Sequence, residues 1–240
     1  MFTFSCKPGG RLKKDRSNEN ISNIGINSTT SSDTNSLSSA TSTELRLSAI
    51  RSDTAFRDVS EKTVFKGSAE LCGKPFSIDN CRGSVLVLLD HTATITIEKC
   101  NNCVIICGPC KGSIFIRNCT NCLILAACQQ FRVQNSHDVE AHIHCSTKPT
   151  IEDSELIVAP LLMSYNGIED DMASAGLDRA LNRWDKVQNF TPDTGLFQLM
   201  PFDPFANGAI GSEVVSDELL EQLTTFMEKP EAQELLLGSS

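Results

Sequence analysis

Ile114-Phe115-Ile116-Arg117-Asn118-Cys119 is a hexapeptide that recurs along the middle of the chain. It matches Phe-Ser-Ile-Asp-Asn-Cys at residues 76–81 and Ile-Thr-Ile-Glu-Lys-Cys at residues 95–100, so the three terminal cysteines lie 19 residues apart. Two weaker copies, Phe-Arg-Val-Gln-Asn-Ser and Pro-Thr-Ile-Glu-Asp-Ser, end at Ser136 and Ser154. A fixed period of this length indicates a solenoid, in which each repeat stacks on the next.

Each copy combines two strand signals. Apolar and polar residues alternate for about five positions, the chain turns at Asn or Gly, and a second β-rich run such as Val85-Leu86-Val87-Leu88 follows. This pattern predicts an all-β core, namely a right-handed parallel β-helix of roughly five coils, with flanking C-terminal helices and a disordered N-terminal tail. Equivalent residues should form inward columns, the first being Ile78, Ile97, Ile116, Val133 and Ile151 and the second Ser84, Cys103, Cys122, Val139 and Ile157.

The sequence divides into three segments. Residues 1–55 begin with a basic run and continue mainly with Ser, Thr and Asn, which favours a disordered tether because few apolar groups can be buried. Residues 56–165 hold the repeats, and residues 166–240 form an acidic extension that we expect to be helical and to pack on the β-helix. Within this extension, apolar spacing predicts helices over 168–186, with Leu181 and Trp184 on the inner side, and over 216–228.

Eleven cysteines permit three interpretations. Packing in the tight corners of stacked coils accounts for most of them, since Ser136 and Ser154 replace cysteine at equivalent places. Zinc binding is an alternative, because C-x-x-C pairs suit tetrahedral coordination. Dithiol chemistry is another, because one pair spells the thioredoxin motif, although a strand follows it where a thioredoxin has a helix. The pairs are Cys100/Cys103, Cys107/Cys110 and Cys119/Cys122. We expect packing and no metal site.

Charge and targeting signals narrow the partner classes. Residues 152–240 carry seventeen carboxylates against four basic side chains, which argues against nucleic-acid binding. The chain has no run of eighteen apolar residues and no signal-peptide pattern, so we expect a cytoplasmic protein. Cys6, which lies beside Phe2, Phe4 and the basic run, is a candidate for S-acylation and for peripheral membrane contact.

Alternation assigns Arg132 to the outer face of the fourth coil. If Phe131 and Val133 point inward, Gln130 and Arg132 point outward. The period then places Glu152 diagonally across from Arg132, where its carboxylate could hold the guanidinium extended. A solvated surface Arg–Glu pair is the plain alternative. The outward column next to Arg132 is Asp79, Glu98, Arg117, Gln134 and Glu152.

Several motifs, in order along the chain, resemble the tubulin-binding cofactor C (TBCC) domain family. They are Asp90-His91-Thr92-Ala93-Thr94-Ile95-Thr96-Ile97, Cys107-Gly108-Pro109, Lys111-Gly112-Ser113-Ile114-Phe115 and Ala127-Cys128-Gln129-Gln130-Phe131-Arg132. The resemblance covers residues 60 to 200 approximately. The segment Trp184-Asp185-Lys186-Val187-Gln188-Asn189-Phe190-Thr191-Pro192 is similar to the retinitis pigmentosa branch of this family.

The resemblance implies a GTPase-activating protein, not an enzyme with its own hydrolytic site. Arg132 matches the family's arginine finger, and Gln130 matches the glutamine that supports it. Glu152, Phe190 and Gln129 fall on the partner-binding surface. The implied partner is an ADP-ribosylation-factor-like small GTPase in its GTP form. That partner would hold GTP and Mg²⁺, so no cofactor is expected on this chain. The implied setting is ciliary or membrane-protein trafficking, at the cilium or basal body.

Other functions stay open at this point. The same arginine would serve a protein that activates the tubulin GTPase during heterodimer folding, and a non-catalytic effector scaffold would bind the GTP-loaded partner without accelerating hydrolysis. No phosphate-cradling loop is present, so we expect the chain not to bind nucleotide alone. His142 and His144 alternate on one strand without an apparent third metal ligand, and we expect them to be polar surface residues.

Overall fold

The computed structural model describes residues 54–67, 69–200, 214–230 and 232–233, all of which belong to one compact unit. Almost all of the predicted tether over residues 1–55, including the candidate acylation site Cys6, lies outside the described residues. Within the described part, no helix is both long enough and apolar enough to cross a membrane.

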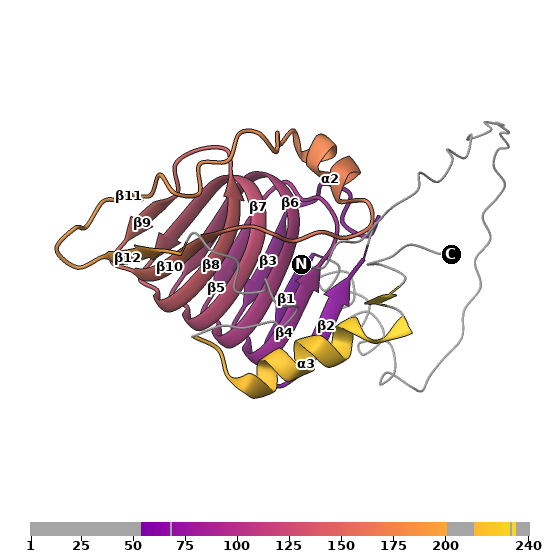
Figure 1. The fold of residues 1–240 in the computed structure, drawn as a ribbon. Helices are drawn as coiled ribbons and strands as arrows, with labels where there is room; N and C mark the ends of the chain where they lie inside the picture. The colour runs from indigo at the N-terminus through magenta and orange to yellow at the C-terminus, as the bar shows by residue number, and fades with distance from the viewer. Residues whose placement is uncertain (1–53, 68, 201–213, 231, 234–240) are drawn as a thin grey trace, which may run out of the picture. The chain divides into compact units, whose positions relative to one another are not determined.

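The repeats form a parallel β-helix of about six turns (Figure 1), which confirms the predicted fold class. Each turn contributes one strand to each of two sides. The first side contains β1 (Ala55–Arg57), β3 (Phe76–Asp79), β5 (Ile95–Glu98), the C-terminal halves of β6 (Asn101–Arg117) and β7 (Thr120–Gln134), β9 (Thr150–Glu152) and β11 (Gln188–Asn189). The second side contains β2 (Thr63–Lys66), β4 (Arg82–Leu88), the N-terminal halves of β6 and β7, β8 (His137–Cys145), β10 (Glu155–Pro160) and β12 (Leu196–Leu199).

The β-helix is longer than the repeats alone indicate. At its start, β1 and β2 form an additional turn without the hexapeptide, and Phe56 pairs with Ile78 to extend the first inward column. At its end, β11 pairs with β9 and β12 pairs with β10, so part of the predicted helical extension consists of strands. The unrecognised strands are two to four residues long, too short for alternation to reveal them.

One of the two predicted helices has the predicted bounds, and the other is shorter than predicted. The helix α3 (Asp217–Met227) agrees with the prediction over 216–228 to within one residue at each end. The prediction over 168–186 was wrong in length, because α2 (Ile168–Ala175) stops at Gly176, which adopts a left-handed conformation with φ 67°. Leu181 consequently lies outside the helix and is 50% exposed, whereas Trp184 packs against the interior of the β-helix.

The inward columns follow the predicted register with one exception. Ile78, Ile97, Ile116, Val133 and Ile151 are cross-strand neighbours in that order. In the second column, Val139 pairs with Leu156, and the predicted Ile157 is wrong by one residue. The cause is the last corner, where Asp153 is left-handed but the second left-handed residue found in the earlier corners is missing, so the turn is one residue shorter.

Left-handed residues mark the corner that joins the two sides of each turn. Two of them, three positions apart, occur in each of the first five coils, and the last coil has one. Asn and Asp tolerate this conformation best among residues with a side chain, which explains the Asn at the fifth position of most copies of the hexapeptide. The first column of left-handed residues is Asp58, Asn80, Lys99, Asn118, Asn135 and Asp153, and the second is Glu61, Gly83, Asn102, Asn121 and Asp138.

The two sides of the β-helix differ in what lies outside them. Val85 and Val87 point outward from β4, yet they are buried with residues of α2 and α3, while Leu86 and Leu88 point into the β-helix. Strands buried on both faces explain the unbroken apolar run at residues 85–88. We call this outer surface, over β4, β6, β7 and β8, the covered face. On the first side, β3 and β5 alternate strictly between buried and half-buried residues, and we call that outer surface the open face.

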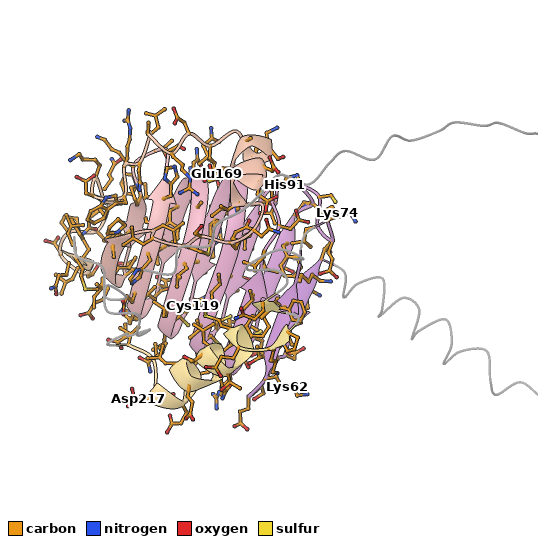
Figure 2. All side chains as sticks on the ribbon, turned by 45° about the vertical axis from the view of Figure 1, so that its right-hand side comes forward. Lys62, Lys74, His91, Cys119, Glu169 and Asp217 are labelled. Carbon is orange, nitrogen blue, oxygen red and sulfur yellow. The ribbon has the colours of Figure 1, made fainter. Side chains whose placement is uncertain are left out.

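Cysteines form ladders inside the β-helix. Nine of the ten described cysteines are buried, and Cys72 is exposed. Cys103 pairs with Cys122, and Cys110 pairs with Cys128, so thiols stack on thiols in adjacent coils. The two members of each C-x-x-C pair therefore belong to different ladders, which is the arrangement expected from packing. Figure 2 labels Cys119, one member of a third ladder, among the strands.

The Cys107-Gly108-Pro109-Cys110 segment is a structural contact. A Cβ atom at Gly108 would lie 2.6 Å from the carbonyl oxygen of Asp90, so the backbone of β6 approaches the preceding coil at a distance that only glycine allows. Burial raises the pKa of Cys107 and of Cys110 above that of a free thiol. Both thiols are fully buried, so neither is the exposed, acidic thiol that dithiol chemistry requires.

Lys99→Asn should stabilise the protein. Lys99 is exposed and adopts a left-handed conformation, which destabilises the fold on the order of 1 kcal/mol for a residue with a Cβ atom. The penalty is smaller for Asn, because Asn tolerates this conformation better than Lys does. Thermal unfolding should show a midpoint about 1–3 °C higher. Lys74→Asn, which changes an exposed lysine outside the left-handed columns, is the control and should give no increase. Equal shifts for both variants would show that charge, and not backbone conformation, is responsible.

Gly108→Ala should destabilise the protein by about 1–3 kcal/mol, because the new methyl group overlaps backbone that cannot move aside. Urea unfolding monitored by Trp184 fluorescence measures the loss. Gly83→Asn is the matched control, since a Cβ atom at Gly83 would meet only the Glu61 side chain, at 3.6 Å, and its neighbour in the next coil is Asn102, which is also left-handed. A Gly108→Ala protein as stable as the parent would contradict the close approach of the two coils.

Candidate functional site

Arg132 lies on the open face, in the C-terminal half of β7. Phe131 and Val133 on either side are buried in the interior, whereas Arg132 is exposed, as alternation predicted. Its neighbours in the adjacent coils are Phe115 on β6 and Thr150 on β9. Because the covered face is occupied by α2 and α3, this uncovered surface is where the β-helix presents long polar side chains to solvent.

Gln130 orients the Arg132 guanidinium. Arg132 Nη2 donates a hydrogen bond to Gln130 Oε1 at 3.1 Å, and the hydroxyl of Ser113 donates to the same oxygen at 2.9 Å. Ser113 and Gln130 are cross-strand neighbours, so the amide is fixed from the preceding coil. Gln130, predicted to support Arg132, does contact it.

Two guanidinium groups lie over the ring of Phe115. The Cζ atoms of Arg132 and Arg117 each lie 5.4 Å from the ring centroid, a distance at which a cation interacts with the π face. Arg117 also pairs with Glu98, with 3.7 Å between Nη1 and Oε1. One of the two cations is therefore matched by a carboxylate.

Arg132 is not matched in this way. Glu152, which we expected to hold its guanidinium, accepts a hydrogen bond from Gln134 Nε2 at 3.4 Å instead. Among the residues that the structure describes, no carboxylate lies within ion-pair distance of Arg132, whose contacts are a neutral amide and an aromatic ring. The positive charge of Arg132 is thus held in place without being neutralised.

Phe190 joins this group from a distant part of the sequence. Its backbone N–H donates to the carbonyl of Ile151 at 3.0 Å, directly after β11 pairs with β9. The Phe190 side chain is 60% exposed. A cavity of about 180 Å³ brings three of the predicted residues together, namely Arg132, Glu152 and Phe190, and the rest of its lining is Phe115, Ile116, Arg117, Val133, Gln134, Thr150 and Ile151.

Gln129 does not line this cavity. It is exposed at the preceding bend of β7, where its carbonyl oxygen accepts a hydrogen bond from the Thr147 backbone N–H at 3.0 Å and another from the Thr147 hydroxyl at 2.9 Å. The structure therefore brings Arg132, Glu152 and Phe190 together at the cavity, with Gln130 bound to Arg132, and leaves Gln129 outside it.

His142 and His144 are not surface residues, so that expectation was wrong. Both point outward from β8 onto the covered face, where His142 lies 2.7 Å from Glu140 and both side chains are buried. His144 is 7% exposed, and burial lowers its pKa. The alternation of the strand was recognised correctly, but the sequence did not reveal that this face is covered.

One cluster has a donor set that suits a metal ion. Asp90, His91 and Asp171 place their ligand atoms within 4.8 Å of one another, and in the part of the chain that the structure describes no other such group occurs. Asp90 Oδ2 already accepts the backbone N–H groups of Leu71 and Cys72, at 2.7 and 2.9 Å, and Asp171 accepts the Tyr165 hydroxyl at 2.5 Å. Figure 2 shows His91 below α2, which agrees with a network that attaches α2 to the β-helix.

Sequence reasoning missed three residues of the site. Ser113, Phe115 and Arg117 contact Gln130, Arg132 and Glu98 respectively, yet none was assigned a role. The signal was available, because extending the outward columns by one period towards the N-terminus places Phe115 beside Arg132 and Ser113 beside Gln130.

Comparison with known proteins shows which family the chain resembles. The family model "Tubulin binding cofactor C" matches residues 73–190. Protein XRP2 of Mus musculus is 46% identical over 144 residues, which is 60% of this chain and 42% of that protein, and Protein XRP2 of Homo sapiens is 44% identical over 154 residues, which is 63% and 44%. Tubulin-specific chaperone C of Mus musculus is 40% identical over 65 residues, which is 27% and 19%.

The chain spans less than half the length of these relatives, and the matched region contains every residue of the cavity. Residues 73–190 form a domain of the tubulin binding cofactor C family.

Proposed function

We propose that this protein is a GTPase activator that supplies Arg132 in trans to an ADP-ribosylation-factor-like small GTPase in its GTP form. The observation that carries the proposal is the state of Arg132, which is exposed, held by Gln130 and Phe115, and not neutralised by a carboxylate. An arginine already paired with a carboxylate would have to break that pair before it could bind a phosphate.

The chemistry of the proposal is electrostatic. During hydrolysis, negative charge redistributes around the transferring phosphoryl group of GTP, and a guanidinium that enters the nucleotide site stabilises it. The partner would provide GTP, Mg²⁺ and the attacking water. Arg132 would provide a planar group with five N–H donors, which matches phosphate geometry better than a lysine ammonium does.

The surrounding residues suit docking. Glu152 and Phe190 line the far side of the cavity from Arg117 and present one negative charge and one exposed aromatic ring. A partner that places a phosphate against Arg132 would place a basic side chain near Glu152 and an apolar surface on Phe190. Aromatic residues of this kind often dominate the binding energy of an interface. Gln129 would contact the same partner at the edge.

Tubulin is the alternative client, and a scaffold without catalysis is the alternative role. The similarity to Tubulin-specific chaperone C extends over 65 residues, against 144 and 154 residues for the two XRP2 proteins, so the sequence favours the small-GTPase branch. Location at the cilium or at a membrane remains part of the proposal.

Arg132→Ala should abolish activation while leaving most of the binding intact. In small GTPases, an arginine supplied in trans accelerates hydrolysis on the order of 10³ to 10⁵-fold. Single-turnover hydrolysis by a GTP-loaded ADP-ribosylation-factor-like GTPase measures the loss, and Arg132→Lys should recover little of it. Arg179→Ala, which removes an exposed arginine that pairs with Glu169 and does not line the cavity, should behave like the parent.

The outcomes separate the alternatives. Tight binding with no acceleration by the parent protein would favour the scaffold. Acceleration of tubulin GTP hydrolysis alone would favour the tubulin client. Acceleration by the parent and by Arg132→Ala at equal rates would disprove the role of Arg132.

Phe190→Ala and Glu152→Gln should weaken binding more than catalysis. We expect the concentration of activator that gives half-maximal acceleration to rise about tenfold for Phe190→Ala, with the saturated rate within about twofold of the parent. Leu181→Ala is the control, because Leu181 is exposed to a similar degree outside the cavity. A Phe190→Ala protein with unchanged half-maximal concentration would place the interface elsewhere.

A further inference from the structure

We infer that Phe115 and Ser113 are positioning residues that hold the Arg132 guanidinium in one conformation, against the Phe115 ring and Gln130, before any partner binds. The inference rests on the proposed function in so far as Arg132 is the residue that enters the nucleotide site of the GTPase. Both residues lie on β6, one coil before Arg132.

Phe115 restrains the guanidinium of Arg132 through contact with its ring. It is the cross-strand neighbour of Arg132, it is half-buried, and its ring centroid lies 5.4 Å from Arg132 Cζ. A phenylalanine on the outer surface of a strand is unusual in its own column, where Thr96 lies in the coil before Phe115 and Thr150 in the coil after Arg132. A flat ring at this position gives the side chain of Arg132 a surface to lie on, which a threonine would not.

Ser113 restrains the guanidinium through Gln130. The Gln130 amide oxygen accepts two hydrogen bonds, from the Ser113 hydroxyl at 2.9 Å and from Arg132 Nη2 at 3.1 Å. The bond from Ser113 fixes which way the amide points. If Ser113 did not hold the amide, Gln130 could rotate and present its NH₂ group, which repels a guanidinium donor.

Arg117 limits the choices that remain to Arg132. The Arg117 guanidinium lies over the same Phe115 ring and forms an ion pair with Glu98. This ion pair keeps Arg117 on the Glu98 side of the ring. Arg132 has no such carboxylate and is repelled by its neighbour, which favours the conformation directed to Gln130. The ring, the amide and the charge of Arg117 thus restrict one flexible side chain from three directions.

Restricting Arg132 in advance has a kinetic consequence. An arginine side chain has large rotamer entropy, and ordering it only in the transition state would raise the barrier. Preorganisation of this kind appears in the rate at saturation, and much less in the concentration needed for half-maximal acceleration. This distinction separates a positioning role for Phe115 from simple packing or from direct contact with the partner.

The test uses the full chain with four variants. Phe115→Leu removes the ring and keeps the volume, Phe115→Tyr keeps the ring, Ser113→Ala removes the hydroxyl, and Ser113→Thr keeps it. Phe65→Leu is the matched control, because Phe65 is also a half-exposed phenylalanine on a strand but contacts Phe226 of α3. Two readouts are collected for each protein: saturated single-turnover GTP hydrolysis by the partner, and the NMR order parameter of the Arg132 Nε–Hε group in the free protein.

We expect Phe115→Leu and Ser113→Ala to lower the saturated rate about 3- to 10-fold and to lower the Arg132 order parameter, with the half-maximal concentration within about twofold of the parent. Phe115→Tyr and Ser113→Thr should restore both readouts, and Phe65→Leu should change neither. Unchanged Arg132 mobility in Phe115→Leu and Ser113→Ala would overturn the inference.

The inference and the proposed function can fail separately. Loss of activation in Arg132→Ala but not in Phe115→Leu, with unchanged Arg132 mobility, would sink the inference and leave the proposed function standing. A lower Arg132 order parameter in Phe115→Leu would support the positioning role even if Arg132→Ala left GTP hydrolysis unchanged, a result that would sink the proposed function alone.

Discussion

Parallel backbone pairing between successive coils is the constraint on which the rest of the structure depends. Each coil hydrogen-bonds to the coil before and after it, so residues at equivalent positions stack about 4.8 Å apart and must suit the same environment. Inward positions become columns of isoleucine and valine, tight corners become columns of cysteine and serine, and left-handed corners become columns of asparagine and aspartate. Apolar burial along these columns supplies the main stabilisation.

The same stacking creates two unlike outer surfaces. On the covered face, the outward residues of β4, β6 and β7 are apolar and pack with α2 and α3, and β8 adds the buried Glu140 and His142. On the open face, the outward residues other than Phe115 are polar and half-buried or exposed, and their columns run from β3 to β9. The open face is therefore the surface on which rows of side chains are accessible to a partner. Arg132, Glu152 and Phe190 lie together on this face.

The environment of Arg132 combines restraint with an unmatched charge. Hydrogen bonding to Gln130 and contact with the Phe115 ring keep the side chain ordered, while Glu98 is used by Arg117 and Glu152 contacts Gln134. A carboxylate bound to Arg132 would order it equally well but would compete with a phosphate. Ordering by neutral groups leaves the electrostatic attraction of the guanidinium available for an anionic partner.

The sequence by itself determined the parallel β-helix, the first inward column and the outward position of Arg132, because a 19-residue period and strict alternation are local patterns that stacking must preserve. It also predicted α3, because apolar residues recur at helical spacing along the whole of this helix. Only the tertiary structure decided that α2 ends at Gly176, that β11 and β12 close the β-helix, and that His142 is buried, since these depend on contacts between segments far apart in the chain. It likewise decided that Glu152 contacts Gln134 and not Arg132. Periodicity fixes which residues are neighbours, but side-chain hydrogen bonds and competing charges decide which neighbours pair.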